Sequence, residues 1–247
     1  MDIADPDFSI SSPLALKPRE VHLWRVNLER VAVAESRWMP VLSADEQARA
    51  ARFHFHIDRQ YFIATRAILR RLVAAYLHCQ PGELTFIYSA KEKPALGGSC
   101  VDNGLEFNVS HSGTMALLAF TLAHPIGVDV EIVRNDFDTA AIAARFFSTV
   151  EQQQLANLPA EQRHEAFFRC WTRKEAYIKA TGDGLSLPLR QFDVSLALHD
   201  QNALLATRPD ETEAKRWALR DVAVKSGYAA AICVSGKDWK LVEAIGT

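Results

Sequence analysis

The sequence predicts an α+β fold built from two similar halves, and three observations lead to this prediction. Short strand-like segments bounded by turn residues occur in both halves of the 247-residue chain. Each half also contains one long amphipathic segment, which is typical of a helix packed on a sheet. In each half the strands end in a run of small and apolar residues, MALLAFTL in the first and YAAAICV in the second. The order of elements alone leaves open whether the halves are a duplication.

The first half follows a polar lead-in over residues 1–20. EVHLWRVNL alternates as a strand does, and SADEQARAARFHF begins a helix in which Ser43 and Glu46 form a capping box. Asp58 can cap a longer helix that runs through about His78, and QPGE ends that helix. The apolar stripe of this helix is Phe62, Ile63, Ala67, Leu69, Leu72, Val73 and Tyr76. Strands are predicted over residues 84–88, 105–110, 114–122 and 126–132, with turns at KEKPALGGS and HSGT.

The second half begins near residue 125. Two short helices are predicted near residues 138–146 and 149–157, and Ser148 with Glu151 gives the second one a capping box. A longer helix over about 161–181 contains FFRCWTRKEAYIKATGDGL, with TGDG as its stop. Strands near 192–198, 217–224 and 227–234 complete this half. The predicted organisation is therefore a lead-in over 1–20 and halves over 21–124 and 125–247, with the active site in a cleft between the halves.

The composition argues against several classes of protein. The formal charge of −2 includes no basic excess, so we expect no nucleic-acid partner. No apolar run approaches the roughly 18 residues of a membrane span, and the acidic N-terminus lacks the apolar core of a signal peptide. The cysteines Cys79, Cys100, Cys170 and Cys233 are far apart and fit buried, reduced thiols. We therefore expect a cytoplasmic protein without a membrane partner.

PIGVDVEIV, residues 125–133, places two acids on one face of a predicted strand. Side chains alternate along a strand, so Asp129 and Glu131 point to the same side. Their like charges repel, and a divalent cation that prefers oxygen ligands, Mg²⁺ or Ca²⁺, would remove this conflict. The alternative is a strand with a wet outer face and two solvated acids. The short D-x-E pattern alone does not exclude that alternative.

The helix near the middle of the second half places charges beside large apolar side chains. Trp171, Glu175 and Lys179 are four residues apart and share a face, and Phe168 and Ile178 flank them. An exposed Glu–Lys pair at this spacing is worth roughly 0.2–0.5 kcal/mol, and a simple surface salt bridge stays one interpretation. The apolar neighbours favour a different one, in which Glu175 is partly desolvated and binds a metal or accepts a proton.

FNVSHSG, residues 107–113, ends a predicted strand at a turn that gathers Ser110, His111 and Ser112. No cysteine or acid beside His111 indicates a nucleophile for it to activate. One interpretation is a structural histidine. The other is a donor to phosphate, next to the backbone N–H groups of a tight turn.

These segments occur together in the order typical of one enzyme family. NVSHS, IGVDVE, RFF and FFRCWTRKEAYIKATGDGL resemble the surfactin-synthetase-type (Sfp-type) 4′-phosphopantetheinyl transferases. RFHFHIDRQYFIATRAILRRL and KEKPAL resemble that family's N-terminal helix and its GKP turn. The resemblance covers about residues 20–234. It implies a monomer of two halves related by a pseudo-twofold axis, each a small, mainly antiparallel sheet packed on a long helix, with coenzyme A between them.

The resemblance implies transfer of the 4′-phosphopantetheine arm of coenzyme A to a serine of an apo acyl or peptidyl carrier protein, with release of adenosine 3′,5′-bisphosphate. Asp129, Glu131 and Glu175 are similar to the family's Mg²⁺-binding acids, and Mn²⁺ is a possible replacement for the ion. The ion would bridge the carboxylates and the pyrophosphate of coenzyme A. Beside Asp129, the implied catalytic residues are Glu175, as the base for the serine proton, and Lys179, which stabilises or protonates the leaving group.

The resemblance also assigns residues to the phosphates of coenzyme A. The assigned residues are Lys174, His111, Ser110, Arg49, Arg66 and Lys93. Arginine suits phosphate because its guanidinium forms two parallel hydrogen bonds. The alternative is that the arginines of the predicted N-terminal helices only lie on the surface in contact with solvent. We interpret Arg70 and Arg71 in this way. Glu92 stands where the family has glycine, and this leaves the role of Lys93 open.

Two rival interpretations belong to other classes of protein. A non-catalytic module that binds coenzyme A or a carrier protein would not need both Glu175 and Lys179. A Mg²⁺-dependent nucleotide hydrolase would be expected to have a G-x-x-x-x-G-K-[ST] phosphate loop, which the sequence lacks. For the transferase, we expect the carrier protein to dock around Phe146, Phe147 and the nearby strand edges. The sequence does not identify the carrier or its pathway.

Overall fold

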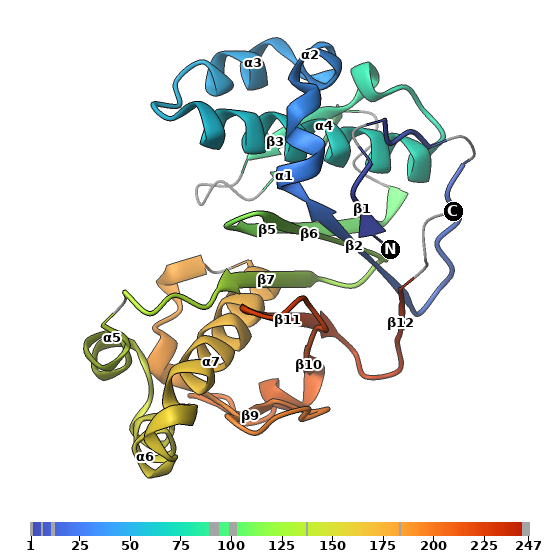
Figure 1. Cartoon of the computed structure of the whole chain (residues 1–247). Helices are drawn as coiled ribbons and strands as arrows, with labels where there is room; N and C mark the ends of the chain where they lie inside the picture. The colour runs from blue at the N-terminus through green and yellow to red at the C-terminus, as the bar shows by residue number, and fades with distance from the viewer. Residues whose placement is uncertain are drawn as a thin grey trace. The chain divides into compact units, whose positions relative to one another are not determined.

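The computed structural model describes residues 2–5, 7–10, 13–88, 94–98, 103–136, 138–182 and 184–243. Figure 1 shows the helices and strands along the chain. Unit 1 comprises residues 1–106, 114–123 and 240–247, and unit 2 comprises residues 107–113 and 124–239. The predicted division after residue 124 differs from these units at two segments. Residues 107–113 belong to unit 2, where their side chains bond to residues 128–132, and the strand at 240–242 pairs within unit 1.

The central strand of unit 1 is β2, Glu20–Asn27. It pairs antiparallel with β6, Met115–Leu122, and parallel with the short strands β1, Asp2–Ile3, and β12, Lys240–Val242. A separate antiparallel hairpin joins β3, Thr85–Tyr88, to β4, Pro94–Gly97. The sequence did not predict β1, β4 or β12, because strands this short show no clear period. Ile3 is buried, so the start of the predicted loose lead-in belongs to the sheet.

The longest helix of unit 1 is α4, His56–Leu77. Every residue of its predicted apolar stripe is buried. The helix begins earlier than predicted, because Phe55 is the N-cap and Asp58 lies inside the first turn, where an acid favours the positive helix end. Before it, α3, Ala44–Ala50, carries the predicted capping box of Ser43 and Glu46. The shorter helices are α1, Leu28–Val31, α2, Glu35–Trp38, and the 3₁₀ segments η1, Ala32–Ala34, η2, Met39–Val41, and η3, Pro81–Glu83.

Unit 2 is built on an antiparallel sheet with the strand order β10, β11, β7. The three strands span Trp217–Asp221, Tyr228–Ser235 and Ile126–Ile132. The helix α7, Ala160–Thr181, lies along this sheet (Figure 1), and Gly182 ends it in the left-handed conformation that TGDG predicted. The other elements are β5, Leu105–Ser112, which enters unit 2 at Phe107, α5, Thr139–Phe146, α6, Thr149–Asn157, β8, Phe192–Val194, β9, Leu204–Thr207, η5, Gly184–Ser186, η6, Leu189–Gln191, and η7, Glu213–Arg216.

A glycine allows α7 to approach β7 unusually closely. A Cβ atom placed on Gly127 would lie 2.1 Å from the backbone oxygen of Ala176 and 2.4 Å from the backbone nitrogen of Ala180. Real Cβ atoms do not approach backbone this closely, so only glycine fits at this position. The contact brings the last turns of α7 against the strand that carries Asp129 and Glu131.

Phe147 lies in the core of unit 2 and not on its surface. It is 0% exposed, and its ring stacks on Phe167 with a centroid distance of 5.2 Å. Phe146 is partly buried and meets the edge of Trp171. The prediction that the carrier protein docks around Phe146 and Phe147 is therefore wrong at Phe147. The aromatic ring of Phe147 fills the core and is not available on the surface.

Both units combine small sheets with a 22-residue helix, so the predicted α+β class is confirmed. The pseudo-twofold axis and the cleft between the halves stay predictions. Cys170 and Cys233 are buried thiols, as expected, whereas Cys79 is only partly buried, and Cys100 lies outside the described residues. Within the described part of the chain, none of the helices has both the length and the apolar character needed to cross a bilayer.

Candidate active site

Asp129 and Glu131 lie on the face of β7 that α7 covers. Gly127 occupies the same face two residues earlier and contacts the backbone of α7 directly. Asp129 is only 3% exposed, and Glu131 is partly buried. The alternative of two solvated acids on a wet strand face is therefore wrong for Asp129. A buried carboxylate needs charge compensation, and the structure supplies it from α7.

Lys179 reaches Asp129 from α7. Its Nζ lies 2.6 Å from Asp129 Oδ1 and also donates hydrogen bonds to Ser110 Oγ at 3.0 Å and to the backbone oxygen of Val128 at 3.3 Å. Each of these atoms belongs to unit 2. The sequence predicted Asp129 and Lys179 as members of one site, and the structure brings them together.

Glu175 lies one turn before Lys179 in an environment that opposes its ionisation. Burial, and then the negative charge of Asp129, raises the pKa of Glu175 to about 7, with a smaller contribution from Glu131, while Lys179 acts in the opposite direction. Burial and the charge of Asp129 also raise the pKa of Glu131. The sequence predicted a partly desolvated Glu175 from its apolar neighbours. A carboxyl group with a pKa near 7 can accept a proton at neutral pH.

Three side chains of β5 hold the outer edge of β7. Asn108 Oδ1 accepts the backbone N–H of Val128 at 2.9 Å. Ser110 Oγ accepts the N–H of Val130 at 3.4 Å, and Ser112 Oγ accepts the N–H of Ile132 at 3.1 Å. We call Asn108, Ser110 and Ser112 the β5 polar row. Sequence reasoning missed Asn108 and Ser112 as site residues, although the N-x-S-x-S alternation was a signal that the three share one face.

The serines of the β5 polar row also hold the acids. Ser110 Oγ donates to Asp129 Oδ1 at 2.9 Å, and Ser112 Oγ donates to Glu131 Oε2 at 2.7 Å. Ser110 was predicted to bind a phosphate of coenzyme A. In the structure it is buried, and its hydroxyl bonds to Asp129, Lys179 and Val130. Ser110 therefore orients the acid–lysine pair, which differs from the phosphate contact that we expected.

The acids fit a divalent cation in chemistry but are not arranged as a closed metal site. Carboxylate oxygens are the donors that Mg²⁺ prefers. Asp129 Oδ2 is buried and has no hydrogen-bond partner among the described residues, which is costly for a carboxylate oxygen without a cation. Across the same described residues, no three His, Cys, Asp or Glu side chains converge as metal ligands. Mg²⁺ usually keeps several waters and binds through one or two carboxylates plus substrate phosphates, so a closed set of three protein ligands is not required.

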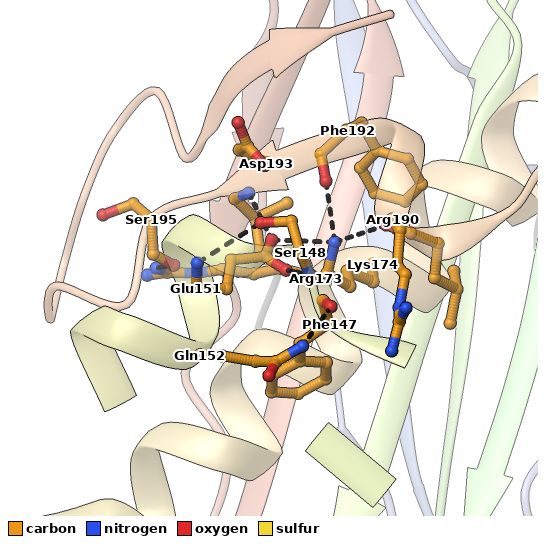
Figure 2. A network of polar contacts seen from close by, with 12 residues as sticks. Phe147, Ser148, Glu151, Gln152, Arg173, Lys174, Arg190, Phe192, Asp193 and Ser195 are labelled. Carbon is orange, nitrogen blue, oxygen red and sulfur yellow. Dashed lines mark hydrogen bonds and ion pairs between the residues drawn. The ribbon is translucent and has the colours of Figure 1, made fainter. Parts of the chain in front are cut away.

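Lys174 does not belong to this site, although it was predicted to hold phosphate. It is completely buried, and its Nζ lies 2.7 Å from Glu151 Oε1 and donates to the backbone oxygens of Leu189 at 2.7 Å and Phe192 at 2.8 Å. Figure 2 shows Lys174 surrounded by Glu151 and Phe192. An ammonium group has three donors, and these partners use all three. The prediction for Lys174 is therefore wrong, because the helix turns this side chain into the core.

His111 is exposed on β5 and stays a candidate for phosphate binding. It lies in the strand, which extends through Ser112, and not in the turn that the sequence predicted. Alternation places it on the opposite face of β5 from the polar row.

In unit 1, Arg49 and Arg66 contact a group of aromatic rings. Their guanidinium carbons lie 5.6 and 5.8 Å from the ring centroid of Phe62, and that of Arg66 also lies 5.7 Å from Phe86 and 5.5 Å from Tyr88. Arg66 Nη1 is buried without a hydrogen-bond partner in the described part of the chain. A strong donor in this state is available to an anion. Lys93 lies outside the described residues.

The sequence interpretation placed Arg70 and Arg71 on the surface, but Arg70 is buried and Arg71 is partly buried. Arg70 is buried and donates to Glu46 Oε2 at 2.6 Å and to two backbone oxygens. Arg71 donates to the backbone oxygen of Phe8, and its guanidinium covers the ring of Trp38. Both arginines therefore stabilise unit 1, and the local sequence could not show this because their partners are distant in the chain.

Comparisons with known proteins identify relatives of this chain. The model of the 4′-phosphopantetheinyl transferase superfamily matches residues 125–233, and a model for the N-terminal part of such transferases matches residues 31–123. The chain is 40% identical to the 4′-phosphopantetheinyl transferase HetI of Nostoc sp. over 92% of each protein. It is 28% identical to the transferase Sfp of Bacillus subtilis, over 82% of this chain and 86% of Sfp. It is also 28% identical to the human L-aminoadipate-semialdehyde dehydrogenase-phosphopantetheinyl transferase, over 80% of this chain and 68% of that protein.

The matched residues include both β7 and α7, which carry the acids and Lys179. This agreement favours a catalytic protein over a module that only binds. The chain therefore belongs to the 4′-phosphopantetheinyl transferase superfamily and is an enzyme of its Sfp type.

Proposed function

We propose that this transferase moves the 4′-phosphopantetheine arm of coenzyme A onto a serine hydroxyl of an apo acyl or peptidyl carrier protein. The family uses coenzyme A as the donor. The serine oxygen attacks the phosphorus that bears the pantetheine arm, and the bond from that phosphorus to the bridging oxygen of the pyrophosphate breaks. Adenosine 3′,5′-bisphosphate leaves with this oxygen. The observation that carries the proposal is the buried Asp129–Lys179 pair beside a Glu175 whose pKa lies near neutrality.

Glu175 is the base in this proposal. Its carboxyl group ionises near pH 7, so it can take the proton of the attacking serine at physiological pH without being fully protonated beforehand. Lys179 supplies positive charge within reach of Asp129 and can stabilise the departing phosphate. Its ammonium carries protons, so it can also donate one to the leaving oxygen.

Asp129, Glu131 and Glu175 would hold Mg²⁺, with Mn²⁺ as a replacement. When bound, the ion neutralises the negative charge that develops on the pyrophosphate. The buried Asp129 Oδ2, without a partner in the described part of the chain, supports this assignment. The environment of Glu131 and Glu175 supports it too, because burial and then the charge of Asp129 raise the pKa values of both groups.

Arg49, Arg66, His111 and Lys93 are proposed to bind the phosphates of the coenzyme. The strongest support is for Arg66, whose Nη1 is buried without a partner among the described residues. A bound phosphate would satisfy this donor with a charge-assisted hydrogen bond, and Arg49 contacts the same ring of Phe62 as Arg66 does. His111 is exposed and can reach a ligand without rearrangement of the core.

One assay tests the function. The protein is incubated with coenzyme A, MgCl₂ and an apo carrier protein, and the carrier is weighed by mass spectrometry. We expect the mass of one phosphopantetheine group to be added to the carrier, and we expect a carrier whose serine is replaced by alanine to stay unchanged. Binding of coenzyme A without any mass gain, across a panel of acyl and peptidyl carriers, would instead indicate a non-catalytic binding module.

A further inference from the structure

The strand β7 forms one edge of the sheet β10, β11, β7 in unit 2. The residues of β7 are in register with β11 along its whole length, for example Asp129 with Ala231 and Glu131 with Ala229. An edge strand leaves a row of backbone N–H groups without a ladder partner. The β5 polar row accepts these N–H groups with side-chain oxygens. The row therefore fixes the position of the strand that carries the acids.

Ser112 makes a second contact that sets the orientation of Glu131. Its oxygen accepts the N–H of Ile132 at 3.1 Å, and the same hydroxyl lies 2.7 Å from Glu131 Oε2. An ionised carboxylate only accepts, so the hydroxyl hydrogen must point at Glu131. Because the N–H of Ile132 engages an oxygen lone pair, the hydroxyl is not free to turn elsewhere. Ser112 thus bonds both to the backbone N–H of Ile132 and to the carboxylate of Glu131, the preceding residue of β7.

Asn108 provides a natural comparison within the same row. It satisfies the N–H of Val128 through Oδ1 in the way that Ser112 satisfies Ile132. Its side chain bonds to no carboxylate in the described contacts of β7, whereas Ser112 does. Any effect of holding the strand edge is therefore common to both residues, and any effect of orienting an acid belongs to Ser112.

We propose that Ser112 is a positioning residue for the divalent-cation site, which it serves by fixing the Glu131 carboxylate in the orientation that binds the ion. The inference rests on the proposed function, because it assumes that Glu131 is a metal ligand. Hydrogen-bonding partners that orient metal-binding carboxylates typically contribute 10- to 100-fold to metal affinity or activity. Ser112 plays this part from β5, an element that holds none of the acids.

The experiment compares the full-length variants Ser112→Ala, Ser112→Thr and Asn108→Ala with the unchanged protein. Mn²⁺ affinity is measured by water-proton relaxation in the presence of coenzyme A, and global stability by urea unfolding. We expect Ser112→Ala to weaken Mn²⁺ binding about 10- to 100-fold. Ser112→Thr keeps the hydroxyl and suits a strand, so it should restore most of the affinity. Asn108→Ala, which removes only a contact to the strand edge, should lower stability and weaken Mn²⁺ binding much less than Ser112→Ala does.

A double-mutant cycle with Glu131→Gln keeps the test decisive even if the threonine variant folds poorly. If Ser112 acts through Glu131, adding Ser112→Ala to Glu131→Gln changes Mn²⁺ affinity no further. Equal losses of affinity in Ser112→Ala and Asn108→Ala, or full additivity in the cycle, overturn the inference and leave the proposed function intact. Absence of Mn²⁺ binding in the unchanged protein overturns the metal assignment itself, and the inference with it.

Discussion

At the scale of single residues, the environment of Glu175 links catalysis to stability. Burial and the neighbouring charge of Asp129 raise the pKa of Glu175 from its ordinary value of 4.5 to about 7. The folded state therefore binds this proton more tightly than the unfolded state does. It follows that the free energy of unfolding falls as the pH rises from about 4.5 through about 7. The group that we propose as the acceptor of the substrate proton thus destabilises the protein at neutral pH.

Glu175→Gln should separate these two effects. In EDTA at pH 8 we expect the variant to be more stable than the unchanged protein by about 1–3 kcal/mol, because an amide does not ionise. At a pH well below 4.5, where the carboxyl group is protonated in both states, the two proteins should have equal stability. Transfer of phosphopantetheine should be lost. Urea unfolding at both pH values and the carrier mass assay measure these outcomes.

The exposed Glu161, in the first turn of the same helix, provides the control. Glu161→Gln should leave the transfer reaction unchanged. If Glu175→Gln is less stable than the unchanged protein at pH 8, the burial of an ionisable carboxyl group at this position is contradicted.

At the scale of elements, the contact between β7 and α7 decides whether the site can form. Gly127 lets the backbone of α7 approach the strand, and Lys179 then reaches Asp129 over 2.6 Å. Backbone atoms of Ala176 and Ala180 cannot move aside as a flexible side chain could. The distance between the acid and the lysine is therefore set by a residue that takes no part in the chemistry.

Gly127→Ala tests this contact. We expect a loss of about 3 kcal/mol or more in the free energy of unfolding, because the added methyl group meets backbone in a closely packed interface. The matched control is Gly82→Ala, since a Cβ atom at Gly82 would meet nothing within 4 Å. Urea unfolding compares the two variants. Equal stability of Gly127→Ala and Gly82→Ala would show that α7 and β7 do not approach as described.

The pair of Glu151 and Lys174 joins α6 to α7 in the core of unit 2. Both side chains, shown in Figure 2, are 0% exposed. Glu151 Oε1 also accepts the N–H of Val194. Removing one member leaves the other charge buried and uncompensated. We expect Glu151→Ala to cost about 3–5 kcal/mol. The double variant Glu151→Ala/Lys174→Met should lose less than the sum of the two single variants, and a strictly additive result in urea unfolding would argue against a buried ion pair.

The sequence predicted elements whose signals are local, and it failed where partners are distant. The capping boxes at Ser43 and Ser148 and the helices α4 and α7 depend on residues within a few positions of one another, and they are confirmed. The role of Lys174 depends on Glu151, 23 positions earlier in the numbering and on another helix, so a phosphate role looked equally acceptable. Ser112 could not be connected to Glu131 without the register between β5 and β7.

At the scale of the whole molecule, the candidate ligand-binding residues belong to two compact units. Arg49 and Arg66 lie in unit 1, and the acids with Lys179 lie in unit 2. The proposed function assigns Arg66 to a phosphate of coenzyme A and Asp129 to the metal ion. A ligand stabilises the folded chain through the contacts that it makes with the folded state. Loss of either set should therefore reduce the stabilisation that the ligand gives, whatever that change does to the protein without ligand.

Thermal unfolding with coenzyme A and MgCl₂ tests this assignment. At a ligand concentration of about 100 times Kd, binding stabilises the folded state by about 2.7 kcal/mol, which raises Tm by about 5–10 °C for a chain of this size. We expect both Arg66→Ala and Asp129→Asn to lose most of this increase. Arg71→Ala, which removes a structural arginine from the same helix as Arg66, should lower Tm without ligand but keep the full increase. A full increase in Arg66→Ala would remove Arg66 from the phosphate site, because a ligand stabilises a protein only through the contacts that it makes with the folded state.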